Sequence, residues 1–134
     1  MPQLKEISTI TTNQISSKDL SENGDLKFAH PQHLLANNSV DWDKYLNIDS
    51  KNPKIKVIVN TGDVIIVIKG GRAGQIFLHN ENTPFVTGQT CAVIKSSETN
   101  LFNKIVAKKD EIQRMITGIA INHISLKSLL ELEV

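Results

Sequence analysis

The sequence has few of the features on which several common functions depend. Its one cysteine, Cys91, cannot form an internal disulfide, which excludes a small secreted scaffold held by disulfides and makes the cytoplasm the expected compartment. Aromatic residues make up 4% of the 134 residues, too few for a sugar-stacking cleft or a stacking platform for single-stranded nucleic acid. No apolar run approaches the roughly 20 residues that cross a bilayer, so we expect no membrane insertion.

The residue patterns of common catalytic and metal sites are also missing. A metal-dependent nuclease needs an acid two places before Lys69, where this sequence has Val67. Residues 82–85 contain only one of the two prolines of an adenine methyltransferase loop, so we interpret them as a turn. The apolar neighbours of Cys91 favour a buried thiol over a nucleophile paired with histidine. The four histidines lack metal-ligand spacing, and we therefore expect no catalytic residue, no cofactor and no metal.

Charge is nearly balanced over the chain but uneven along it. Fifteen basic against fourteen acidic residues give a formal net charge of +1, which is not the basic balance of a free-standing nucleic-acid-binding protein. Between residues 51 and 75, basic residues accompany a single acid, Asp63. The sign reverses over residues 41–49, where acids outnumber Lys44. Positive charge therefore gathers in the middle of the chain.

Length and apolar periodicity predict one α+β domain, since no repeat or linker divides the chain. Several segments have the apolar pattern of β-strands separated by turns: residues 7–11, 26–29, 54–59, 64–68, 75–79 and 85–94. After Thr99, helical spacing predicts a helix of about fifteen residues that ends near Gly118, and Ser125 is suited to cap a shorter one. We expect a small, mostly antiparallel curved sheet or partial barrel, with one main helix and short helices packed against it.

A glycine turn lies between two of the predicted strands. Residues 70–74 (Gly-Gly-Arg-Ala-Gly) lack the Gly-Lys-Ser/Thr ending of a phosphate loop and lead into a predicted strand rather than a helix, which disfavours triphosphate binding. The turn places Lys69 and Arg72 at its tip, where two cations can reach phosphates or a base edge. The spacing alone is equally consistent with a plain hairpin turn whose charges are solvated.

Four stretches occur in an order that carries more information than any one of them: residues 4–10, 62–75, 86–94 and 117–129. Together they resemble a target-recognition domain of a type I restriction–modification specificity subunit. Residues 62–75, with a Gly-Asp pair, an apolar strand and a glycine turn, resemble the most distinctive run of that family. The sequence departs from the family at Gln75, where lysine is usual, and near Asn13, where glycine is frequent. The long helix that spaces two recognition domains is absent, which is consistent with a truncated subunit.

The resemblance implies that residues 1–134 are one non-catalytic domain that recognises a sequence in double-stranded DNA. The implied partners are adenine methyltransferase subunits, an endonuclease and translocase subunit, and a second recognition domain. Lysine and arginine are expected on phosphates or guanine, and glutamine on adenine edges. The expected DNA-binding residues are Lys69, Arg72, Gln75, Gln89, Lys54, Lys56, Gln32 and His33. Two alternatives stay open: a small β-rich module that binds only protein, and a small thiol or histidine hydrolase.

Overall fold

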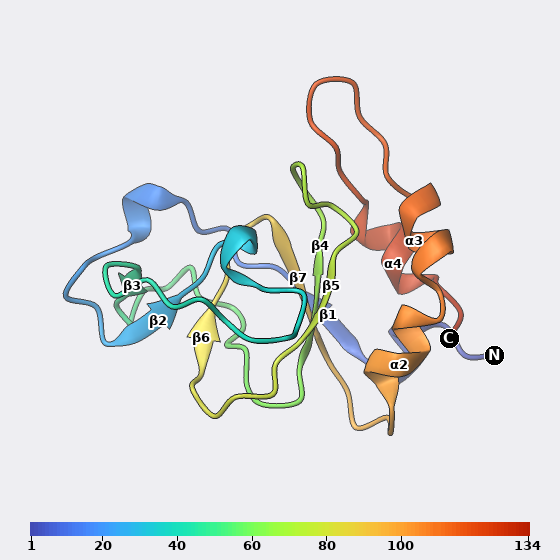
Figure 1. The fold of residues 1–134 in the computed structure, drawn as a ribbon, viewed down its shortest axis with the longest axis horizontal. Helices are drawn as coiled ribbons and strands as arrows, with labels where there is room; N and C mark the ends of the chain where they lie inside the picture. The colour runs from blue at the N-terminus through green and yellow to red at the C-terminus, as the bar shows by residue number, and fades with distance from the viewer.

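Two small β-sheets lie side by side, and the helices cover the outer side of the larger one (Figure 1). The computed structural model describes residues 1–134. The larger sheet is antiparallel throughout, in the order β1 (Thr9–Thr11), β7 (Cys91–Lys95), β4 (Val64–Val67) and β5 (Ile76–Leu78). The smaller sheet has the order β3 (Asn47–Ile48), β2 (Leu26–Phe28) and β6 (Phe85–Val86). Its β2 runs parallel to β6 and antiparallel to β3.

The helices are short, and three of the four α-helices follow β7. Two single turns of 3-10 helix interrupt the loops of the first half, η1 at Ser17–Asp19 and η2 at Pro31–His33. The α-helices are α1 (Leu4–Ile7), α2 (Leu101–Val106), α3 (Lys109–Arg114) and α4 (Leu126–Leu130). None of them has the length and apolar character needed to span a membrane.

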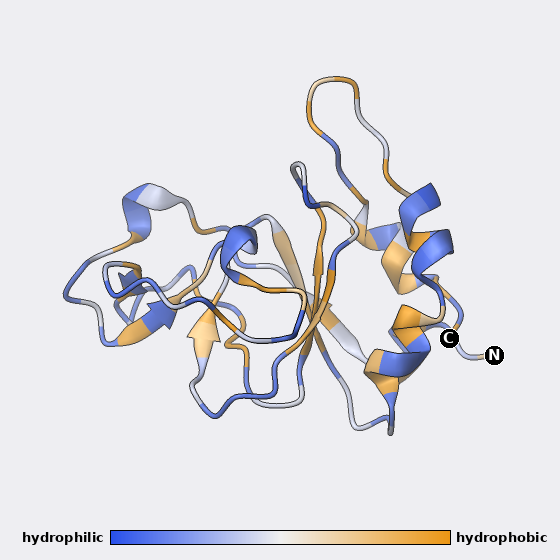
Figure 2. Ribbon diagram, viewed as in Figure 1, coloured by the Kyte–Doolittle hydropathy of each residue, from blue (hydrophilic) through white to orange (hydrophobic).

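Strand β4 lies at the centre of the molecule because both of its faces are covered. Val64 and Ile66 pack into the core beneath the helices, with the buried Leu101, Ile105 and Ile112. The alternate residues Ile65 and Val67 pack into a second core with Phe77 and Phe85. A strand covered on both faces is expected to be apolar at every position, which explains the uninterrupted run. Figure 2 shows this hydrophobic centre between more hydrophilic outer loops.

The structure confirms the predicted α+β class, with mostly antiparallel sheets that do not close and short helices packed against them. The predicted main helix is, however, two helices. The helix is interrupted at Lys108, whose backbone N–H bonds to the carbonyl of Ile105, three residues back rather than four. The predicted strand over residues 85–94 is also divided, because residues 87–90 carry the chain from the smaller sheet (β6) to the larger one (β7).

The predicted strand over residues 54–59 is wrong, although its alternation correctly indicates which residues are buried. Val57 and Val59 are buried, but the segment joins no sheet and forms one bridge, between Val59 and Phe85. Before that bridge, the segment bonds to the side chain of Asn13. Asn13 Oδ1 accepts the N–H groups of Lys56 at 2.6 Å and Val57 at 3.0 Å, and Nδ2 donates to the carbonyl of Val57 at 2.9 Å. A buried amide therefore takes the place of a neighbouring strand.

Candidate functional site

The turn between β4 and β5, residues 69–74, has a shape that requires glycine, and we call it the cationic turn. Gly70 and Gly74 have φ angles of 93° and 94°, which other residues rarely adopt. Gly74 is also buried, and a Cβ there would lie 2.3 Å from the side-chain nitrogen of Gln113. The turn holds Lys69 and Arg72 exposed, and neither side chain takes part in an ion pair. Both cations are therefore free to contact a ligand.

The 3-10 turn η2 lies opposite the cationic turn, and together they enclose an open depression that we call the cationic hollow. Its lining residues are His30, Pro31, Gln32, Lys69, Gly70, Gly71 and Arg72. None of them is hydrophobic or acidic, so the hollow suits a polar or anionic ligand. Three of the residues predicted from sequence, Gln32, Lys69 and Arg72, thus come together from segments about 40 positions apart.

His30 also lines the cationic hollow, although the sequence suggested its imidazole only as a partner for a thiol or a metal. Its ring lies edge-on to Phe28, with 5.1 Å between the ring centroids, and 5.9 Å from the ring of His33. Burial, and after it the neighbouring His33, lowers the pKa of His30 below its usual value. A neutral imidazole can donate or accept a hydrogen bond, so His30 suits the floor of a polar binding surface. No local pattern in the sequence indicates that His30 reaches this surface.

Gln89 lies in a second depression that shares one residue, His30, with the cationic hollow. It is exposed and lines this depression with Ser16, Ser17 and Thr90. A side-chain amide at this position can bond to a base edge with both its oxygen and its nitrogen. Gln89, from the connection between the two sheets, therefore lines a depression that adjoins the cationic hollow at His30.

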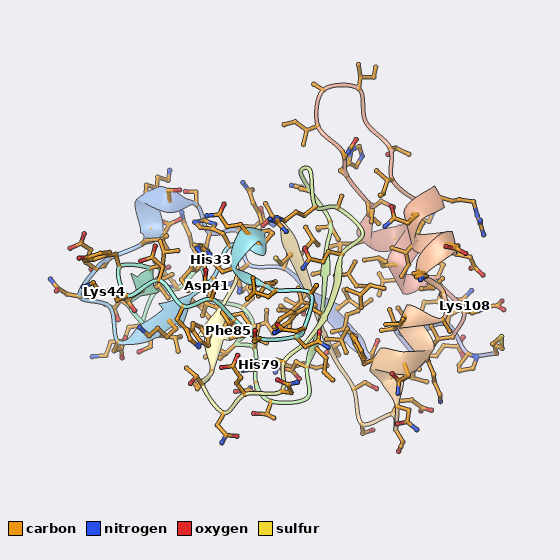
Figure 3. The ribbon with its side chains drawn as sticks, viewed as in Figure 1. His33, Asp41, Lys44, His79, Phe85 and Lys108 are labelled. Atoms are coloured by element: carbon orange, nitrogen blue, oxygen red, sulfur yellow. The ribbon has the colours of Figure 1, made fainter.

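Two further predicted residues have partners within the protein. Gln75 Nε2 donates to the backbone carbonyl of Leu34 at 2.6 Å, which ties the segment after η2 to the cationic turn. The Nδ1 atom of His33 accepts the backbone N–H of His30 at 3.2 Å. Figure 3 shows His33 close to Asp41, whose backbone N–H bonds to the carbonyl of His33 at 2.8 Å. The contacts of Gln75 and His33 shape the cationic hollow from inside the protein.

The two remaining predicted residues do not line the cationic hollow. Lys54 Nζ lies 2.9 Å from a carboxylate oxygen of Asp19. The backbone N–H of Ser16 and then Lys54 lower the pKa of Asp19. Lys56 is exposed and lines a separate depression beside Lys95, which is itself paired with Asp63. Sequence proximity to Lys69 therefore does not bring these lysines to the same surface.

Buried polar groups provide no evident catalytic arrangement. Burial raises the pKa of Cys91 to about 12, and the polar neighbour of its thiol is the hydroxyl of Thr90 at 3.8 Å. His79 is buried edge-on to Phe85, and its Nε2 lies 2.7 Å from the carbonyl of Thr83 (Figure 3). That contact closes the turn before β6. No group of three or more His, Cys, Asp or Glu side chains is placed to hold a metal ion.

Comparisons with known proteins point to one family. The sequence profile of the type I restriction modification DNA specificity domain matches residues 1–134. No protein of curated function matches the chain in sequence.

Solved structures of restriction–modification proteins share the fold. The S subunit of the type I restriction–modification system from M. genitalium has a TM-score of 0.64 at 13% identity, covering 98% of this chain and 32% of that one. An HsdS subunit from Thermoanaerobacter tengcongensis has a TM-score of 0.70 at 14% identity, covering 98% and 31%. A structure described as the basis of complex assembly and conformational transition of the type I R-M system has a TM-score of 0.71 at 15% identity, covering 97% and 32%. The chain thus spans about a third of the length of these proteins.

Proposed function

The chain belongs to the family of type I restriction modification DNA specificity domains, and from this we propose that it recognises a sequence in double-stranded DNA through the cationic hollow. The observation that carries the proposal is the pairing of Lys69 and Arg72 on a rigid glycine turn, without an acidic partner, beside a hollow that contains no acid. Phosphates supply much of the affinity in protein–DNA complexes, and two free cations on a fixed loop are suited to bind them.

The arrangement separates positioning from reading. Lys69 and Arg72 contact phosphates and fix the orientation of the domain on the duplex. Gln32 and Gln89 are exposed in the two depressions that share His30, and their amides read adenine edges. Gln75 acts indirectly, because its hydrogen bond to the carbonyl of Leu34 fixes the position of η2 relative to the cationic turn. Lys54 and Lys56 lie outside this surface and contribute at most long-range attraction.

We propose further that the chain catalyses no reaction itself and directs adenine methylation and DNA cleavage by partner subunits in the cytoplasm. One structure with this fold is described in terms of complex assembly of the type I R-M system, which supports an assembled working form. In such an assembly several subunits share the phosphate contacts, so a net charge of +1 is sufficient. The alternative, a module that binds only protein, is not favoured, because the basic surface that it would lack is present.

The test compares two charge-matched double variants. Lys69→Ala/Arg72→Ala removes the cations of the cationic turn, and Lys5→Ala/Lys127→Ala removes two exposed cations from α1 and α4. Binding to a fluorescent duplex is measured by anisotropy over a range of salt, with the chain alone and in the assembled methyltransferase. If each turn residue contacts one phosphate, the slope of log K against log salt flattens by about 1.8 in the first variant. It stays unchanged in the second.

Two results would count against the proposal. Equal weakening by both double variants would show that only net charge matters. Unchanged binding in the Lys69→Ala/Arg72→Ala variant would remove the cationic turn from the interface. Because all four side chains are exposed, thermal unfolding of both variants should match the wild type, and this control separates lost contacts from lost folding.

A further inference from the structure

The segment between α3 and α4 forms a projecting hairpin with an apolar end. Thr117 and His123 exchange two backbone hydrogen bonds, of 2.9 and 2.8 Å, so the two sides of residues 117–123 run antiparallel. Gly118 has a φ of 124°, and a Cβ there would lie 2.1 Å from the carbonyl oxygen of Ile121. The hairpin is therefore tightly folded and specified by glycine.

The end of this hairpin, residues 119–121 (Ile-Ala-Ile), is exposed, and we call it the apolar tip. Ile119 is fully exposed and Ile121 is 65% exposed. Figure 2 shows a hydrophobic end on this loop, well away from the hydrophobic centre of the molecule. Single exposed isoleucines are common, but two of them at the end of one projecting hairpin indicate a contact with something outside the chain.

The hairpin is attached to the cationic turn. Gly70 N–H bonds to the carbonyl of Asn122 at 2.9 Å, and Ile124 N–H bonds to the carbonyl of Ile68 at 2.8 Å. Lys69 and His123 form the bridge between these two bonds. Both loops extend toward the same end of the molecule (Figure 1). A ligand that reaches Lys69 therefore lies beside the apolar tip.

We propose that the apolar tip enters the major groove of the bound DNA and contacts the methyl groups of thymine, while Lys69 and Arg72 hold the phosphates at the groove edge. This inference rests on the proposed function and adds the base contact that the cations do not supply. The hairpin consists of two antiparallel chain segments joined by one bridge, and a pair of segments of this kind fits the major groove of about 12 Å but not the minor groove of about 6 Å. The thymine methyl is the apolar group that base edges present in the major groove.

A protein partner fits this surface less well. A stable protein interface buries about 800 Å² on each side, and the residues that flank the apolar tip, Thr117, Asn122 and His123, are polar. Two isoleucines and an alanine are a small contact, of the size of one or two base-edge methyl groups. The neighbouring cations also favour an anionic ligand over an apolar protein surface.

The experiment uses duplexes that the wild-type chain, in the assembled methyltransferase, selects from a randomised pool. Each selected duplex is remade with deoxyuridine in place of every thymine, which removes only the 5-methyl groups. The wild type should bind the uracil duplex about fourfold more weakly for each methyl group contacted, from ~0.8 kcal/mol per buried carbon. Ile119→Ser/Ile121→Ser should bind both duplexes equally, with the salt slope of the wild type. Tyr45→Ser, at an exposed position in the loop before β3, should behave as the wild type.

The inference is overturned if the Ile119→Ser/Ile121→Ser variant prefers the thymine duplex over the uracil duplex as strongly as the wild type does. It is also overturned if the selected duplexes share no thymine. A third contrary outcome is a variant that binds DNA normally but no longer joins the methyltransferase subunits. The last would make the apolar tip a protein contact. Failure of the proposed function is seen separately, in the salt slope of Lys69→Ala/Arg72→Ala. Loss of methyl discrimination can therefore be observed whether or not the cations behave as proposed.

Discussion

Replacing Asn13 with alanine should destabilise the fold more than the same exchange of any other polar side chain. Asn13 is fully buried, and its amide makes four hydrogen bonds to backbone groups of Lys56, Val57 and Thr87. These bonds join the irregular segment before β4 to the connection between the two sheets, which leads to Gln89. The amide therefore helps to fix the position of one edge of the candidate interface.

The expected cost follows from these four bonds. A net contribution of about 1 kcal/mol for each gives ~4 kcal/mol, because alanine leaves two N–H groups and two carbonyls without partners. That loss is close to the whole free energy of unfolding of the least stable native domains, about 5 kcal/mol. Asn13→Asp should cost at least as much as alanine, because its carboxylate would be a buried charge held against the carbonyl oxygens of Val57 and Thr87, although it still accepts from Lys56 and Val57.

Urea unfolding followed by the fluorescence of Trp42, the single tryptophan, measures the effect. The urea midpoint should fall strongly for Asn13→Ala. Asn103→Ala, on the exposed face of α2, should leave the free energy of unfolding within about 0.5 kcal/mol of the wild type. A cost below about 1 kcal/mol for Asn13→Ala would refute the reasoning, since it would mean that water replaces the amide freely.

Three further predictions concern the site and the core. Gly70→Ala should destabilise the cationic turn by about 1–2 kcal/mol and weaken DNA binding, because φ is 93° there, whereas Gly71→Ala should be neutral in both assays, since nothing lies within 4 Å of its added Cβ. Because the pKa of His30 is lowered in the folded chain, the unfolded chain binds a proton on this imidazole at a higher pH than the folded chain does. The free energy of unfolding should therefore fall as the pH drops below about 6.5, and a His30→Gln variant whose free energy of unfolding falls equally with pH would contradict this. Cys91, whose pKa burial raises to about 12, should react with a thiol reagent only at the rate of unfolding, and rapid labelling of the native chain would contradict its placement in β7.

The sequence predicted burial better than it predicted hydrogen bonding. Residues 64–68 were predicted as a strand from their unbroken apolar run, and the structure shows that this run reflects cover on both faces, by one core on each side. The alternation at Val57 and Val59 also reported burial, but it could not show that the partner of this segment is the side chain of Asn13, 44 residues away from Val57. Long-range polar contacts of this kind leave no periodic signal.

Of the candidate site, the sequence predicted the cationic turn but not the segments that fold against it. The positive charges of Lys69 and Arg72 could be identified locally, because a glycine turn between strands exposes its tip. Gln32 and His30 reach the same surface only through the folding of η2 across the turn, which no local pattern indicates. The apolar tip was missed because isoleucines at 119 and 121 are typical of buried strands, and only the structure shows them exposed.

The most direct test of the central claim is a map of the DNA-binding face by nuclear magnetic resonance. Duplex DNA is added to the ¹⁵N-labelled chain, and the shifts of the backbone amides are followed. We expect the largest shifts at residues 69–74, at η2 and at Gln89, together with the apolar tip of residues 119–121, and the face around Lys56 and Lys95 unaffected. Shifts that gather around Lys56 and Lys95 instead, or a spectrum that does not change, would contradict the assignment of the cationic hollow as the surface that meets DNA.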